Sequence, residues 1–163
     1  MESQQQNRKL LNEASQLSIT RLSSAKGRPS TISPADLTPH ILVVDDDPII
    51  CQQLERLYTH SGYRVTLAGL AEQAIELLAD EDIDLIVTDI RLPGLSGVEL
   101  AKRCVEQWSD VPIIVMTGYG TVKTAVEAMQ LGAAHYIQKP LDPDELNLLI
   151  QRAIEKKQLE EKV

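Results

Sequence analysis

The sequence predicts an α/β fold: a doubly wound sheet of five parallel strands in the order 2-1-3-4-5. Short apolar runs rich in β-branched residues alternate with longer segments whose apolar residues recur at helical spacing. Five such strand–helix units follow one another along the chain. Right-handed crossovers place their helices on both faces of a parallel sheet. The order 2-1-3-4-5 is a common one for an open sheet of this kind.

The strands are expected where apolar and β-branched residues concentrate, because such residues fit a pleated, buried surface. These runs are Ile41–Val44, Arg64–Ala68, Leu85–Thr88, Ile113–Met116 and Ala134–Gln138. Four of them lead directly into polar residues that phosphate chemistry can use: the Asp45-Asp46-Asp47 run, Asp89, Thr117 and Lys139. An open parallel sheet binds its ligand just beyond the carboxyl ends of its strands. These side chains should therefore converge in one small volume.

Each expected helix carries one apolar stripe at i, i+3, i+4 spacing. In chain order the stripes are Ile50, Leu54, Leu57 and Tyr58; Ala71, Ala74, Ile75 and Leu78; Leu100, Ala101, Cys104, Val105 and Trp108; Val122, Ala125, Val126 and Met129; and Leu146, Leu149, Ile150 and Ala153. Gly62 and Gly132 follow the first and fourth stripes. Asp142 and Pro143 open the fifth helix as an N-cap and a first-position proline.

Charge divides the chain into unlike parts. Residues 1–39 hold five Lys/Arg and three Asp/Glu, a net charge of +2, and residues 40–163 hold eleven and twenty-one, a net charge of −10. We expect residues 1–39 to be a polar, disordered N-terminal extension, residues 40–157 to form the folded domain, and residues 158–163 to be a charged helical tail or the start of a linker. The acidic domain argues against direct binding to nucleic acid or to an anionic membrane. With no signal-like start and no long apolar run, a cytoplasmic protein is predicted.

The acidic residues after the first strand are candidates for a metal site. Asp47 followed by Pro48 reads as a helix N-cap. Asp45 and Asp46 are left as ligands for Mg²⁺, a hard cation that carboxylates bind. Asp89 could be a metal ligand, a base, or a nucleophile that forms an acyl phosphate. A transferred phosphoryl group also needs a fixed positive charge and a hydrogen-bond donor, which Lys139 and Thr117 could supply.

Four segments resemble the signatures of the receiver domains of two-component response regulators: Val43–Pro48, Val87–Gly94, Met116–Gly118 and Tyr136–Pro140. The resemblance covers about residues 40–157. It implies a (βα)5 flavodoxin-like fold and a phosphorylation-dependent switch that takes its phosphoryl group from a histidine kinase or a phosphotransfer protein. Such a domain is not a stand-alone enzyme, although it catalyses its own phosphorylation and dephosphorylation.

The resemblance also implies a role for each matching residue. Asp89 would be the phosphoacceptor. Mg²⁺ would be bound by Asp45, Asp46, Asp89 and the backbone carbonyl of Arg91. Thr117 and Lys139 would bind the phosphoryl oxygens, and Tyr136 would be an aromatic switch residue. The Lys139–Pro140 peptide bond would be cis, a form that is rare except before proline.

Gly118–Thr121, Ala125–Met129 and Gly132–Ala133 are similar to the receivers of nitrogen-regulation-type, enhancer-binding activators. Those regulators carry an ATPase and a DNA-binding domain after the receiver, and neither a Walker A motif nor a helix-turn-helix follows here. We therefore expect output through a partner, or through a homodimer formed by the fourth helix, the fifth strand and the fifth helix.

Three other readings stay open at this point. In a phosphohydrolase of the haloacid-dehalogenase type, Asp45 would be the nucleophile of an Asp-x-Asp motif, but Asp142 and Asp144 fit helix caps better than the late acidic pair of that family. A degenerate receiver would only bind partners. A flavin-binding module of the same fold would need a Ser/Thr-rich loop after the first strand. Phosphorylation of Asp89 rather than Asp45 separates the first alternative from a receiver.

Overall fold

The structure of the protein is a computed structural model, which describes residues 38–118 and 122–161. Nearly all of the expected N-terminal extension lies outside the described residues, as do the last two residues of the expected tail. The described residues from Pro39 onward belong to one compact unit.

Within the described residues, parallel strands form one sheet of five in the order β2-β1-β3-β4-β5, as predicted. The strands are β1 (His40–Val44), β2 (Arg64–Ala68), β3 (Leu85–Asp89), β4 (Ile113–Thr117) and β5 (His135–Gln138). Val44 pairs with Thr88, Asp89 pairs with Met116, and Thr117 pairs with Gln138. The carboxyl ends of β1, β3, β4 and β5 therefore lie at neighbouring positions along one edge of the sheet.

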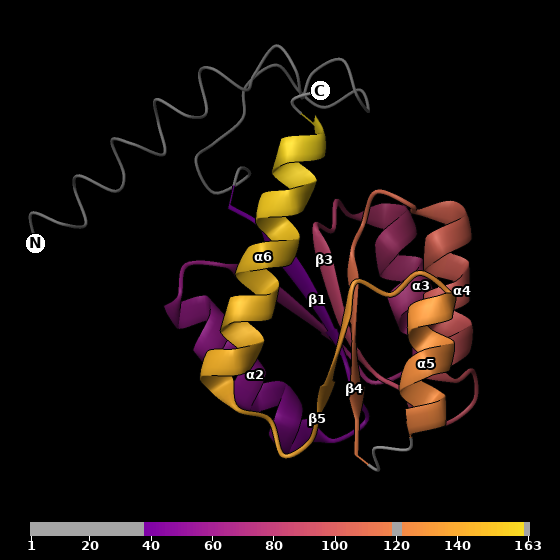
Figure 1. Ribbon diagram of the computed structural model, residues 1–163. Coiled ribbons are helices and arrows are strands. Elements are labelled where there is room, and N and C mark those ends of the chain that lie inside the picture. Colours follow the sequence, from indigo (N-terminus) through magenta and orange to yellow (C-terminus); the bar gives the residue numbers. More distant parts are fainter. Residues whose placement is uncertain (1–37, 119–121, 162–163) are drawn as a thin grey trace, which may run out of the picture. The chain divides into compact units, whose positions relative to one another are not determined.

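Helices cover both faces of the sheet (Figure 1). They are α2 (Pro48–His60), α3 (Ala71–Asp80), α4 (Gly97–Gln107), α5 (Val122–Gln130) and α6 (Pro143–Glu161). Helices α2 and α6 pack on one face, and α3, α4 and α5 pack on the other (Figure 1). None of the helices in the described part of the chain combines the length and the apolar character needed to cross a membrane.

The core consists of two aliphatic layers, one on each side of the sheet. Alternate residues of β1 show the division, because Ile41 and Val43 face α2 and α6 while Leu42 and Val44 face the other three helices. Every residue of β1, β3 and β4 is buried. Strands buried on both faces read as continuous apolar runs rather than as alternating ones. The sheet is therefore fixed on both sides, and its carboxyl edge is a rigid support for a site.

The boundaries differ from the expected ones by about a residue. Asp89 and Thr117 are the last residues of β3 and β4 rather than the first residues after them, because the parallel ladder extends through both. Ala134 precedes β5, although its N–H group donates to the carbonyl of Ile113 at 2.9 Å. Trp108 caps the C-terminus of α4 instead of lying within it.

Candidate functional site

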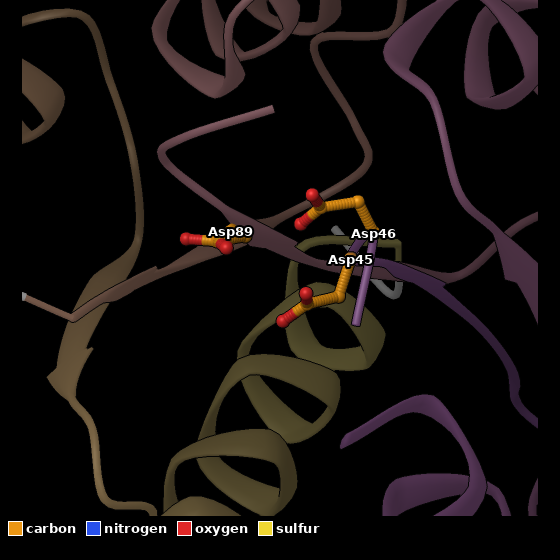
Figure 2. A group of neighbouring side chains, drawn as sticks. All are labelled: Asp45, Asp46 and Asp89. Carbon is orange, nitrogen blue, oxygen red and sulfur yellow. The ribbon is translucent and has the colours of Figure 1, made fainter. Parts of the chain in front are cut away.

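Three carboxylates gather at the carboxyl edge of the sheet, around the ends of β1 and β3 (Figure 2). Asp45, Asp46 and Asp89 each offer an oxygen that lies within 4.8 Å of the others. Asp45 and Asp89 are buried, with 1% and 8% of their surfaces exposed, whereas Asp46 is exposed. Two buried carboxylates and one exposed carboxylate offer the oxygen ligands that a hard cation prefers. Such a cation could bind them on one side and keep water molecules on its other side.

Asp47 does not join this group, because it begins α2. Its side chain accepts a hydrogen bond from the N–H of Ile49 at 2.9 Å, and Pro48 occupies the first turn. The interpretation of Asp47 as an N-cap is confirmed. Its own N–H donates to Asp45 Oδ1 at 2.9 Å, and the thiol of Cys51 donates to the main-chain oxygen of Asp45 at 3.2 Å. The start of α2 thereby fixes the orientation of Asp45.

Lys139, which directly follows β5, contacts the acids at the ends of β1 and β3. Its Nζ atom lies 2.8 Å from Asp45 Oδ2 and 3.1 Å from Asp89 Oδ2. Its backbone N–H donates to the carbonyl of Thr117 at 2.8 Å, which ties it to β4. The Lys139–Pro140 peptide bond is cis. One ammonium group therefore contacts two carboxylates that are far apart in the sequence.

The charges in this site are not balanced. Burial lowers the pKa of Lys139, but its hydrogen bonds to the carboxylates of Asp45 and Asp89 raise that pKa above its ordinary value. For Asp45 the largest effect is burial, which raises its pKa even though Lys139 is in contact. Lys139 contacts two of the three acids, and the ionised form of Asp45 is not fully stabilised. A divalent cation bound by these oxygens would supply the missing positive charge.

Thr117 supplies a hydroxyl group that lacks a partner. It is only 1% exposed, and among the described residues its Oγ1 atom forms no hydrogen bond. A buried polar group without a partner is costly, so native structures rarely keep one without a reason. The hydroxyl is thus available to an oxygen-rich ligand at the end of β4.

Asp89 ends β3 and lies against both the loop that follows and the first residue of α4. Its Oδ1 atom accepts a hydrogen bond from the N–H of Arg91 at 3.3 Å. Gly97, the first residue of α4, has no room for a side chain, because a Cβ atom there would collide with the main-chain oxygen of Asp89. This close approach fixes the loop from residue 90 to residue 96, in which Arg91 lies, beside the Asp89 side chain.

Tyr136 lies on β5, outside the group of acids, and is 50% exposed. It borders a hollow of about 320 Å³ on the α5 side, which Ala125, Val126, Met129 and Gln130 also line. Val126 and Met129 are 45% and 42% exposed. The side chain of Val122 lies outside the description, and Ala133 is buried. Among the described residues of α5 and β5, Val126, Met129 and Tyr136 are the exposed large apolar ones.

Two charged contacts were not foreseen from the sequence. Glu72 Oε1 accepts a hydrogen bond from the N–H of Leu95 at 3.0 Å, which joins α3 to the loop that follows β3. Asp84 accepts from the N–H of His40 at 2.8 Å and from Lys157 Nζ at 3.1 Å, so it links the first strand to the last helix. Neither contact leaves a spacing pattern, because each joins residues that are distant in the chain.

Comparisons with known proteins agree with this geometry. The pattern of the response regulator receiver domain matches residues 41–151. The transcriptional regulatory protein FixJ of Bradyrhizobium diazoefficiens is 43% identical over 71% of this chain and 56% of its own length. The DNA-binding transcriptional regulator NtrC of Escherichia coli is 38% identical over 70% of this chain and 24% of its own length. The chain thus spans about a quarter to just over half of these relatives.

A solved structure shows the same fold. The receiver domain protein from Clostridium thermocellum is 30% identical, covers 74% of this chain with 98% of its own, and gives a TM-score of 0.71. NtrC among the relatives confirms the expected likeness to receivers of nitrogen-regulation-type activators.

Proposed function

Because this chain belongs to the response regulator receiver domains, which are phosphoaspartate signalling switches, we propose that Asp89 is its phosphoacceptor. The donor is a phosphohistidine of a sensor histidine kinase or of a phosphotransfer protein. We propose residues 40–157 as the receiver, preceded by an extension and followed by a charged tail.

The carboxylate of Asp89 attacks phosphorus as the nucleophile. An oxygen–phosphorus bond forms, the phosphorus–nitrogen bond of the donor breaks, and the imidazole nitrogen leaves with the electron pair. Lys139, whose Nζ atom lies 3.1 Å from Asp89 Oδ2, stabilises negative charge on the transferred group, and the buried hydroxyl of Thr117 donates to one of its oxygens. The same groups assist the later attack of water on phosphorus, which returns Asp89 and releases phosphate.

The oxygens of Asp45, Asp46 and Asp89, with the backbone carbonyl of Arg91, are proposed to hold Mg²⁺. The ion, when bound, would neutralise charge on the carboxylates and on the phosphoryl oxygens. The raised pKa of Asp45 supports this assignment, because burial disfavours its ionised form by more than the hydrogen bond from Lys139 offsets, and a bound cation would stabilise that form. Asp46 is exposed and keeps one side of the group open to solvent, from which the ion and the donor arrive.

The observation that carries the proposal is the contact of one ammonium group with both Asp45 and Asp89, together with the buried hydroxyl of Thr117 at the end of β4, which has no hydrogen-bond partner among the described residues. The test is incubation of the protein with a small acyl phosphate, such as acetyl phosphate, with and without Mg²⁺. Intact-mass spectrometry should show one phosphoryl group per chain, and only when Mg²⁺ is present.

The variant Asp89→Asn should stay unlabelled, since its amide is not a nucleophile for this step. Asp110→Asn is the matched control, because Asp110 is an exposed acid in the turn before β4. It should be labelled like the wild type. Full labelling of Asp89→Asn would contradict the assignment.

The output is proposed to pass through α5, β5 and α6. A phosphoryl group on Asp89 gives the Thr117 hydroxyl a partner, and movement of Thr117 at the end of β4 changes the space beside β5. Tyr136 lies on β5 next to the apolar hollow formed with Val126 and Met129, so its ring can turn toward the sheet edge. Such a turn would change an exposed, partly apolar surface, through which we propose that the chain binds a partner or a second copy of itself.

A further inference from the structure

The loop between β3 and α4 is held at its base by the main chain. The N–H of Gly97 donates to the carbonyl of Ile90 at 3.0 Å, which closes the loop where α4 begins. Near its start, the N–H of Arg91 donates to Asp89 Oδ1 at 3.3 Å. Arg91 is the residue whose carbonyl is proposed as a cation ligand, so the position of this loop matters for the site.

The far side of the loop rests on a carboxylate from another helix. Glu72 Oε1 accepts a hydrogen bond from the N–H of Leu95 at 3.0 Å, although the two residues are 23 positions apart. Gly94 has a φ of +76°, and the nearest atom to a Cβ built there would be the same Glu72 oxygen, at 3.1 Å. The turn at Gly94 and Leu95 therefore fits directly against the Glu72 carboxylate.

The helical turn that carries Glu72 is held in place by the core. The neighbours of Glu72 on α3, Ala71 and Ala74, are fully buried, so the first turn of this helix is packed into the core. Glu72 lies in that first turn, where the helix dipole favours a negative charge. Its own backbone N–H, and then that of Leu95, hold the pKa of Glu72 below its ordinary value. The carboxylate is thus ionised at neutral pH, and an ionised carboxylate accepts a stronger hydrogen bond than a neutral group does.

We propose that Glu72 is a positioning residue for the cation site: by holding Leu95, it keeps the loop from Arg91 onward in the conformation that presents the Arg91 carbonyl to the cation held by the acids. This role rests on the proposed function. Glu72 is not one of the three clustered acids, and its contact with the loop is to the backbone of Leu95. It therefore acts on the site through the loop.

The test compares Glu72→Ala and Glu72→Gln with the control Glu76→Ala, an exposed acid one turn later on the same helix. Mg²⁺ binding is measured by titration with NMR detection, and hydrogen exchange of the Leu95 amide is measured in the same samples. For Glu72→Ala we expect the Mg²⁺ Kd to rise about three- to tenfold, the range of one lost hydrogen bond, and the Leu95 amide to exchange faster. Glu72→Gln keeps an acceptor oxygen and should recover most of the affinity.

The thermal midpoint of Glu72→Ala should fall by only a few degrees, because the residue is exposed and loses one hydrogen bond. Glu76→Ala should match the wild type in every readout. Unchanged Leu95 exchange in Glu72→Ala would overturn the proposal, and so would faster exchange with an unchanged Mg²⁺ Kd. A wild type that binds no Mg²⁺ would instead overturn the proposed function and this role with it, which keeps the two failures apart.

Discussion

Replacing Lys139 with methionine removes an ammonium group that contacts both buried acids, Asp45 and Asp89. Methionine keeps most of the length and the apolar stem of lysine, so the loss is chiefly one of charge. Asp45 and Asp89 then face each other without the amine that now lies 2.8 and 3.1 Å from them. We expect the folded protein without added metal to lose stability.

The size of the loss follows from burial. The side chains of Lys139, Asp45 and Asp89 are 18%, 0% and 11% exposed, so solvent screens this contact little. Removing one partner of a buried ion pair costs about 3–5 kcal/mol, but a buried acid can take up a proton instead of staying charged. For Lys139→Met at pH 7 we therefore expect a loss of about 2–3 kcal/mol in the free energy of unfolding.

The pH dependence gives the sign of the effect. Burial already raises the pKa of Asp45 in the wild type, and without Lys139 it should rise further. The cost of the substitution is complete above this raised pKa, where Asp45 is ionised in both the folded and the unfolded chain. It declines as the pH falls from that pKa toward the ordinary pKa of an unfolded aspartate, because a protonated Asp45 needs no ammonium partner. The difference between variant and wild type should thus shrink as the pH falls from 7 toward about 4, the ordinary pKa of an aspartate.

Urea unfolding in EDTA, followed by circular dichroism, measures this difference at several pH values. Lys102→Met is the matched control, since Lys102 is exposed on α4, and it should change the unfolding free energy by less than about 0.5 kcal/mol. A loss below about 1 kcal/mol for Lys139→Met that stays constant from pH 7 to about pH 4 would refute the electrostatic reasoning.

Further predictions concern the core, the amino end of the sheet and the output surface. Tyr58 is fully buried and, within the described residues, its hydroxyl has no partner, so Tyr58→Phe should raise the unfolding free energy by about 1 kcal/mol; a clear loss would contradict this. Burial, and next the charge of Arg64, lower the pKa of His40. Its contribution to stability should therefore be complete above about pH 6.5 and decline as the pH falls through its lowered pKa, and His40→Gln should flatten that slope in urea unfolding. An equal slope in both proteins would count against it. Beryllofluoride with Mg²⁺, a phosphoryl mimic, should shift amide resonances of α5 and β5 and raise the average mass in light scattering. Shifts confined to the ends of β1 and β3, with one mass at all micromolar concentrations, would contradict the output surface.

The fold could be predicted because strands and helices leave patterns in short stretches of sequence. Apolar runs and helical spacing locate the elements, and right-handed crossovers then leave few topologies. The site could be predicted for a related reason. Asp45, Asp89, Thr117 and Lys139 each end or follow a strand, and parallel strands bring such residues to one edge. The strand ends were misplaced by a residue because the ladder between neighbouring strands, which the sequence does not display, decides where a strand stops.

Contacts between side chains and distant backbone could not be predicted in this way. The hydrogen bond from Leu95 to Glu72 depends on where a loop folds back over a helix, and an exposed glutamate in a first helical turn has a sufficient local explanation. Asp84 likewise precedes a strand without any pattern that would indicate its contacts with His40 and Lys157. That Lys139 would contact Asp45 as well as Asp89 was also a matter of three-dimensional geometry.

The identity of the phosphorylated residue tests the central claim most directly. The wild-type protein is treated with acetyl phosphate and Mg²⁺ and then reduced with borohydride, which converts an aspartyl phosphate to homoserine. Peptide mass spectrometry then locates the changed residue. The account predicts homoserine at position 89 and an unchanged Asp45. Homoserine at position 45, or no modified aspartate at all, would contradict it.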